Sequence, residues 1–395
     1  MEVDVDTHEE QRHTEVTRRV VSVGFVSTTP PTPCGIATFT TALAAALARD
    51  GVRCSVVRVL DVPEPAPLTS PVPIVATLVA SDPSTVASAV RALNRRDVAV
   101  IQHEYGLYGG ADGESIVTVM RDVRVPIITI LHTVLPHPTS HQRWVLNEVV
   151  RYSDQVVVMS NTARSTLGEV YEVGATPVSV IAHGAMVMPC AMAPRGARPL
   201  ILTWGLIGPG KGIEWAIDAV ATLRDLTPRP RYVVAGRTHP KVLATSGDVY
   251  RRSLEHRVRE RHAGSMVEFD NTYRSLDSLE QLIASADVVI LPYDSREQAT
   301  SGVLVDALAA GRPVVATAFP HAVEMLSSGA GLIVDQGDAA GMAFALRRIL
   351  TEPATAAAMR AEAFRLAPTL SWDAVAARYR SMIDSLVDRE VAHVL

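Results

Sequence analysis

The sequence predicts an α/β protein made of two doubly wound domains, each with a parallel sheet between layers of helices. Short apolar runs alternate with helical segments, and the 395 residues exceed the usual length of one domain. Met188–Pro199 is rich in proline and small residues, as linkers are. We therefore expect a first domain over 19–190, a second over 191–370 and a final helix over 371–395. The densely charged residues 1–18 lack an apolar period and are predicted to be a disordered tail.

The strands of the first domain are predicted from short apolar runs bounded by turn residues. Helical composition marks Ile36–Arg49 and Pro83–Leu93, and the proline-rich segment Pro63–Pro73 is expected to be a loop. The predicted strands are Val20–Val26, Arg53–Leu60, Val98–Gln102, Pro126–Leu131, Gln155–Met159 and Val178–Ile181.

The second domain repeats the alternation. Gly212–Leu223 is its first predicted helix, and an amphipathic helix begins near Ser371 with Trp372 as its apolar anchor. The predicted strands are Ile201–Trp204, Arg231–Ala235, Met266–Phe269, Val288–Leu291, Val314–Ala316 and Leu332–Val334.

Composition narrows the function classes. The net charge of −5 is small, so electrostatics imply neither nucleic acid nor an anionic membrane as partner. No stretch approaches the roughly 20 apolar residues that span a bilayer, and the N-terminus lacks a signal-peptide core. We therefore expect a cytoplasmic protein without stable membrane insertion.

The cysteines and histidines do not form a metal-binding pattern. Three cysteines, Cys34, Cys54 and Cys190, are widely spaced and include no CxxC pair, which fits a reducing compartment. The histidines at strand ends lack the paired spacing of a zinc site. We expect no metal and no cofactor.

The stretch Arg296–Thr317 predicts a ligand site. A buried helix begins after Thr300, Ser301 and Gly302, whose small side chains expose the unpaired N–H groups and positive dipole end of a helix. That end suits a phosphate, and Asp306, one turn inside, suits a polyhydroxyl group. The alternative is a strand–loop–helix unit of an ordinary α/β core.

Histidines also leave two predicted strands of the first domain. Val98–Gln102 runs into His103 and Glu104, and Pro126–Leu131 runs into His132. Ligands of open parallel sheets gather at the carboxyl ends of strands, so these residues are functional candidates, with a capped strand end as the alternative.

The loop after the first strand of the second domain has a phosphate-loop spacing. Gly205, Gly210 and Lys211 match GxxxxGK, but Gly212 stands where a nucleotide triphosphatase needs Ser or Thr for Mg²⁺. A triphosphatase therefore remains a minor alternative. Close backbone approach at the glycines and a cation at a helix start favour a diphosphate.

Taken together, these segments resemble glycosyltransferase family 4, two-domain retaining enzymes of the GT-B type. The resemblance rests on CGIATF, LHT, VIAHG, GKG and SGVLVDALAAGRPVVAT followed by Glu324, in this order. It covers nearly the whole chain after residue 19. It implies two Rossmann-like domains facing across a cleft, with the last helix crossing back onto the first domain.

The resemblance also implies roles for individual residues. Gly35 would lie beside the donor diphosphate, His132 would bond a hydroxyl of the donor sugar, and Lys211 would neutralise the phosphates. Backbone N–H groups of Ser301, Gly302 and Val303 would join Lys211, with Gly210 beside it. Asp306 would take the ribose hydroxyls, and His103 or Glu104 would orient the acceptor.

The chain departs from the family pattern at two places. Members commonly carry two glutamates eight positions apart, where this chain has Gln298 and Asp306. Glu297 would substitute for Gln298 if the loop shifts by one residue. The arginine after the first strand of the second domain is replaced by Leu206, and Arg237 would supply the missing charge.

The activity implied is transfer of a hexose, with retention and without a metal, from a nucleotide-diphosphate sugar to an acceptor hydroxyl. GDP-mannose and UDP-hexoses are the donors considered. The acceptor class, whether small molecule, glycan or lipid-linked sugar, stays open. A non-catalytic nucleotide-sugar-binding protein is the second reading, kept because of Gln298 and Leu206.

Overall fold

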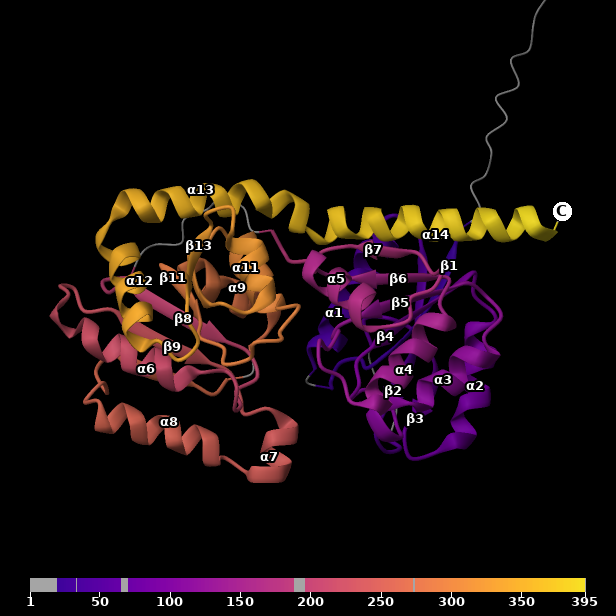
Figure 1. Cartoon of the computed structure of the whole chain (residues 1–395), viewed down its shortest axis with the longest axis horizontal. Coiled ribbons are helices and arrows are strands. Elements are labelled where there is room, and N and C mark those ends of the chain that lie inside the picture. The colour runs from indigo at the N-terminus through magenta and orange to yellow at the C-terminus, as the bar shows by residue number, and fades with distance from the viewer. Residues whose placement is uncertain (1–19, 33, 65–69, 188–195, 273, 395) are drawn as a thin grey trace, which may run out of the picture.

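A computed structural model describes residues 20–394, apart from residues 33, 65–69, 188–195 and 273. The predicted tail over 1–18, Cys190 and most of the predicted linker lie outside the described residues. The rest forms two α/β units, each with its own sheet and cores (Figure 1).

The first sheet is parallel throughout, in the order β3-β2-β1-β4-β5-β6-β7. Most of its strands are buried on both faces, which explains why they read as continuous apolar runs. The strands are β1 (Ser22–Ser27), β2 (Arg53–Leu60), β3 (Ile74–Val79), β4 (Val98–His103), β5 (Ile127–Leu131), β6 (Gln155–Val158) and β7 (Val178–Val180).

Edge strand β3 was not predicted from the sequence. Its first four residues are only partly buried or exposed, because it pairs with β2 alone, and it directly follows the proline-rich segment. All the strands predicted for this domain are present to within two residues at each end.

Helices cover both faces of the first sheet. One core packs α1 (Gly35–Arg49) and the last helix, α14 (Trp372–Val394), against one face. The other core packs α2 (Val86–Leu93), α3 (Ser115–Asp122), α4 (Ser140–Arg151) and α5 (Asn161–Val170) against the opposite face.

The second sheet is also parallel, in the order β10-β9-β8-β11-β12-β13. Its strands are β8 (Leu200–Trp204), β9 (Arg231–Ala235), β10 (Val267–Asp270), β11 (Val288–Leu291), β12 (Val314–Thr317) and β13 (Gly331–Val334). Its helices are α6 (Ile213–Ala221), α7 (Pro240–Ser246), α8 (Val249–Glu260), α9 (Leu276–Ser285), α10 (Gly302–Ala309), α11 (Pro320–Leu326), α12 (Ala339–Thr351) and α13 (Pro353–Leu370).

Both sheets contain a topological switch point, where the strand order reverses. It lies between β1 and β4 in the first sheet and between β8 and β11 in the second. A crevice opens outside the carboxyl ends of the strands at such a point, which is where open α/β sheets bind ligands. The prediction of two doubly wound domains is confirmed.

The last helix crosses from the second domain to the first, as predicted. Helix α13 lies over the second domain and α14 over the first (Figure 1). At the crossing, Ala185 N donates to Leu370 O at 2.8 Å and Trp372 N to Ala185 O at 3.2 Å. A Cβ on Gly184 would lie 2.3 Å from the Trp372 ring, so this ring seats directly on the glycine.

Replacing Gly184 with alanine should loosen this crossing. We expect Gly184→Ala to lower the free energy of unfolding by about 1–3 kcal/mol, because the new methyl overlaps the Trp372 ring. Gly168→Ala on α5, where a Cβ meets nothing within 4 Å, is the matched control and should be neutral or stabilising. Chemical denaturation checks both, and equal stability of the two variants would contradict this account.

Candidate active site

Loops from both domains meet at the carboxyl ends of the two sheets. His183, just after β7, lies against the start of α10, since its Nε2 is 3.0 Å from the position of a Cβ on Gly302. At a second contact between the two domains, Lys241 Nζ of α7 donates to Gly106 O at 3.0 Å. The two predicted site regions therefore face each other.

The N-terminus of α10 has unused hydrogen-bond donors. Ser301 caps the helix by accepting from Leu304 N at 3.3 Å, and Ser301 N donates to Nδ1 of His321 at 2.9 Å. Within the part of the chain that the structure describes, the N–H groups of Gly302 and Val303 have no partner. A phosphate is the natural acceptor for two free N–H groups at a helix start.

The loop after β8 lies next to this helix start. Gly205, at φ +117°, is 3.8 Å from Val303 when measured from the position of its Cβ. Lys211 follows on the same loop, and its Nζ lies 4.2 Å from the centroid of the Tyr293 ring, which stacks on Phe319. This cation–π contact holds the ammonium at the end of β11, just before the loop that leads into α10.

Gly212 shows why this loop is not a triphosphatase loop. It adopts φ +60°, and a Cβ there would lie 1.8 Å from Pro292 O. The backbone thus leaves no room for the Ser or Thr that would bind Mg²⁺. The loop is fixed to the chain after β11 by this contact and by the hydrogen bond from Asp294 N to Gly210 O at 3.0 Å.

His132 and His183 are held by one aromatic ring of α1. Phe39 contacts the rings of His132, His183 and Trp372 edge-on, at centroid distances of 5.1, 5.1 and 5.2 Å. Helix α1 thereby connects the predicted sugar-binding histidine, the start of α10 and the crossing helix.

Both histidines are neutral in the folded protein. Burial, with a smaller effect of His183 and His103, lowers the pKa of His132 to about 3, and burial lowers the pKa of His183 to about 4. His132 Nε2 donates to Gln102 Oε1 at 2.6 Å, which leaves Nδ1 as an acceptor for a hydroxyl. A neutral imidazole in this state bonds a sugar without placing a charge beside it.

Asp306 is partly buried on α10, one turn inside its N-terminus. Burial, helped by the nearby carboxylate of Glu280, raises the pKa of Asp306 to about 7. A carboxyl group held in this way gains from bonding to hydroxyl donors. This position agrees with the predicted ribose contact, which remains a prediction.

The loop before α10 carries the two residues at the family's first glutamate position. Gln298 is partly buried and donates from Nε2 to Thr300 O at 3.1 Å, whereas Glu297 is exposed. Arg237, after β9, is exposed and donates to Asn271 O at 3.4 Å. Their predicted roles as catalytic and donor-binding residues stay predictions.

The predicted acceptor residues differ in accessibility. His103 is buried at 1% exposure, with burial lowering its pKa to about 4, so its side chain lies within the first domain. Glu104 is partly buried and accepts from Thr133 Oγ1 and from Tyr105 N. Burial raises the pKa of Glu104 against these hydrogen bonds and the charge of Lys241. Glu104 is the better placed of the two to meet a substrate.

Gly35 begins α1, and a Cβ there would meet nothing within 4 Å. The space beside it is therefore open, as a donor diphosphate would need, although the glycine itself is not required by its neighbours.

Several site residues were not predicted from the sequence. Tyr293, Phe39 and His321 act through contacts between distant segments, and no local pattern indicates them. His183 had a signal, because it follows a predicted strand end as His132 does.

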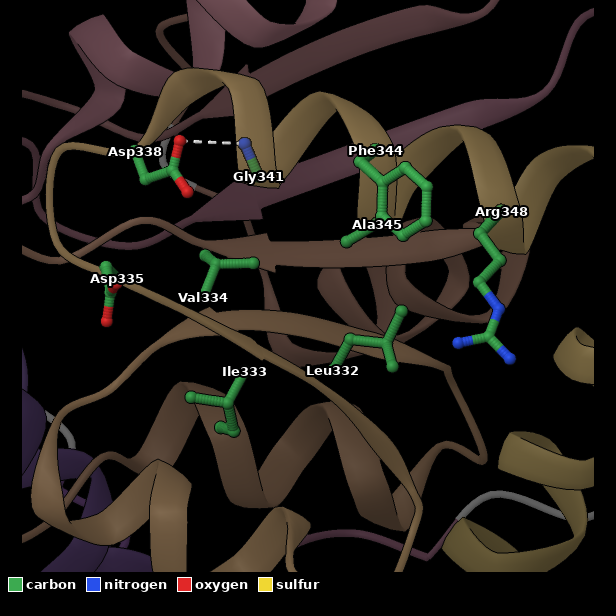
Figure 2. Close-up of a pocket in the computed structure, with 9 residues that line it drawn as sticks. All are labelled: Leu332, Ile333, Val334, Asp335, Asp338, Gly341, Phe344, Ala345 and Arg348. Carbon is green, nitrogen blue, oxygen red and sulfur yellow. Dashed lines mark hydrogen bonds between the residues drawn. The ribbon is translucent and has the colours of Figure 1, made fainter.

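A separate pocket of about 360 Å³ lies between edge strand β13 and α12 (Figure 2). Asp338 at its rim accepts from Gly341 N at 2.8 Å and caps α12. None of the predicted site residues lines it, and we assign it no role in the reaction.

Solved structures share this architecture. Anabaena HepE, in complex with UDP and glucose, aligns with a TM-score of 0.74 at 16% identity, covering 92% of this chain and 100% of that one. Sucrose-phosphate synthase from Thermosynechococcus elongatus aligns at 0.73 and 19%, covering 93% and 100%. The fold is that of a GT-B glycosyltransferase. The family model Glycosyltransferase Family 4 matches residues 33–185, and the model Glycosyl transferases group 1 matches 198–352. The resemblance to glycosyltransferase family 4 seen in the sequence is confirmed.

Curated relatives are also glycosyltransferases. A glycogen synthase of Mycobacterium tuberculosis is 28% identical over 269 residues, which are 64% of this chain and 61% of the relative. A D-inositol 3-phosphate glycosyltransferase of Kineococcus radiotolerans is 29% identical over 260 residues, 58% of this chain and 56% of the relative. The chain thus spans about three-fifths of the length of these relatives. These relatives favour a glycosyltransferase over the triphosphatase alternative.

The described residues bear on two kinds of partner, a membrane and a metal ion. None of their helices is long and apolar enough to cross a membrane. No group of three or more His, Cys, Asp or Glu side chains among them is arranged to hold a metal ion.

Asp306 should cost the unliganded protein stability above neutral pH. Its folded pKa is raised, so its favourable contribution is present below about pH 4 and is lost as the pH rises through about 7. Asp306→Asn should therefore raise the free energy of unfolding at pH 8 by on the order of 1 kcal/mol, since solvent screens a partly buried group. Chemical denaturation at pH 4 and pH 8 measures this. Exposed Asp335→Asn is the control, and a gain of equal size at both pH values would refute the assignment.

Proposed function

We propose that this enzyme transfers a hexosyl group from a nucleotide-diphosphate sugar to an acceptor hydroxyl, with retention at the anomeric carbon and without a metal. The observation that carries the proposal is the start of α10, where the N–H groups of Gly302 and Val303 are free and His183 faces them from the other domain. The diphosphate would bind there, and Lys211 would neutralise the charge that builds on the leaving group.

The proposed step keeps the reaction on one face of the sugar. The acceptor hydroxyl oxygen bonds to the anomeric carbon as the bond from that carbon to the diphosphate oxygen breaks. The hydroxyl proton passes to an oxygen of the departing diphosphate. Gln298 offers hydrogen bonds to sugar hydroxyls but no negative charge, so positive charge on the sugar would be balanced mainly by the diphosphate itself.

The donor is proposed to be a UDP-hexose or GDP-mannose. A UDP-hexose is supported by Anabaena HepE, a fold neighbour solved with UDP and glucose and also with UDP-glucose. Asp306 would accept from the ribose hydroxyls at the inner end of this site. The acceptor would enter from the first domain, next to Glu104.

The stereochemistry tests the proposal without a known acceptor, because water replaces the acceptor slowly in donor hydrolysis. With an α-linked donor, retention predicts that α-hexose is released first and then equilibrates with the β form. Proton NMR of UDP-glucose and GDP-mannose incubations, with Mg²⁺ or EDTA, follows the anomers. First release of the β-hexose would overturn retention, and loss of turnover in EDTA would overturn metal independence.

Lys211 should matter for turnover more than for folding. We expect Lys211→Met to lower kcat by about 100-fold, because it removes the ammonium that would neutralise negative charge on the leaving diphosphate while nearly keeping the side-chain length. Its melting temperature should stay close to that of the parent protein. The control is Arg252→Met on the exposed face of α8. Comparable kcat in the two variants would remove Lys211 from the mechanism.

A further inference from the structure

A carboxylate of the second domain binds a helix end of the first domain. Glu324 on α11 accepts from Asn161 N and Nδ2 through Oε1, both at 2.9 Å. It accepts from Thr162 N and Oγ1 through Oε2, at 3.0 and 3.1 Å. These donors form the first turn of α5, where the helix dipole also favours a negative charge. Burial acts to raise the pKa of Glu324, yet these hydrogen bonds hold it below its usual value.

The same end of α5 also holds the loop that leads into α10. Ser160 caps α5 by accepting from Ala163 N at 3.0 Å, and its hydroxyl donates to Ala299 O at 2.9 Å. Ser160 is 1% exposed, and Ala299 packs into a core of the first domain. A loop that belongs to the second domain is thus seated on the first.

His321 fastens this loop from the other side. It lies on α11, three residues before Glu324, and is buried at 1% exposure. His321 N donates to Gln298 O at 3.4 Å, and its Nδ1 accepts from Ser301 N at 2.9 Å. Residues Gln298, Ala299 and Ser301 are therefore each held by a contact that begins at α5 or α11.

We propose that Glu324, Ser160 and His321 are positioning residues that couple closure of the two domains to the geometry of the donor loop Gln298–Ser301. When Glu324 binds the first turn of α5, the hydrogen bond from Ser160 and those of His321 fix the conformation of the donor loop. The free N–H groups of Gly302 and Val303 directly follow this loop, so they take their catalytic position only in the closed arrangement. This inference rests on the donor site proposed above.

The coupling predicts an effect on turnover that exceeds the effect on nucleotide affinity. If Glu324 no longer binds the first turn of α5, Lys211 and the helix start of α10 are still together in the second domain and still bind the nucleotide. The sugar then lacks the alignment with the first domain that the transfer step needs, and misplacement by about 1 Å costs about 100-fold in rate.

We would compare Glu324→Ala and Glu324→Gln with the parent protein and with Glu362→Gln, an acid-to-amide control on α13. We expect kcat for donor turnover to fall by about 100-fold in Glu324→Ala. It should fall less in Glu324→Gln, whose amide carbonyl can still accept from Asn161. The Kd for UDP and GDP, measured by calorimetry, should change by less than about threefold. A matching fall in UDP affinity, or an unchanged kcat, would overturn the proposal.

His321 provides a rescue test. His321→Leu removes the acceptor for Ser301 N and should lower kcat as Glu324→Ala does, whereas His321→Asn keeps an acceptor and should recover part of it. Equal loss of kcat in both variants, in step with a lower melting temperature, would mean a structural role only.

Solution scattering separates failure of this inference from failure of the proposed donor chemistry. Glu324→Ala should have a larger radius of gyration than the parent protein in saturating UDP, whether or not any sugar is transferred. If the parent protein turns over no donor, the proposed function fails, but the scattering comparison still tests whether the Glu324 contact with α5 holds the domains closed. An unchanged radius of gyration would overturn it.

Discussion

Two backbone N–H groups at the start of α10, those of Gly302 and Val303, set the constraint on which the site depends. A helix start that is buried without partners costs free energy, and Ser301 takes only one of the orphan donors. Unpaired donors at a helix start suit an anionic acceptor. Gly205 has no side chain facing Val303, and Gly302 has none facing His183.

Few charged groups lie near this helix start. His183 and His321 contact this helix start, and His132 shares the Phe39 ring with His183; all three are neutral because burial lowers their pKa. Lys211 is held at the side, over the Tyr293 ring. A diphosphate bound here, as proposed, would meet dipoles and one ammonium group, a preorganised arrangement that would need little rearrangement when charge develops during reaction. Asp306 lies further along α10, one turn from the helix start where the diphosphate is proposed to bind.

The sequence predicted what depends on local pattern and missed what depends on distant contact. Buried parallel strands read as apolar runs, so both sheets were found, but β3 is a half-exposed edge strand behind a proline-rich loop and was not. The helix start at Ser301 was visible from its small residues. Phe39, Tyr293 and His321 act through contacts with segments far along the chain, so no local sequence pattern predicts their roles. His103 follows a strand as His132 does, but its side chain is buried within the first domain.

The two domains are joined at more than one place, and the places differ in kind. At the crossing of the last helix, Trp372 packs on Gly184 and Phe39, an apolar contact whose strength varies little with small rotations. At α5, Glu324 meets four donors within 3.1 Å, and such hydrogen bonds weaken steeply once the angle and distance change. The first contact therefore suits a hinge that stays packed while the domains move, and the second suits a contact made only when they close. Because α11 carries both Glu324 and His321, the sensitive contact is the one tied to the donor loop.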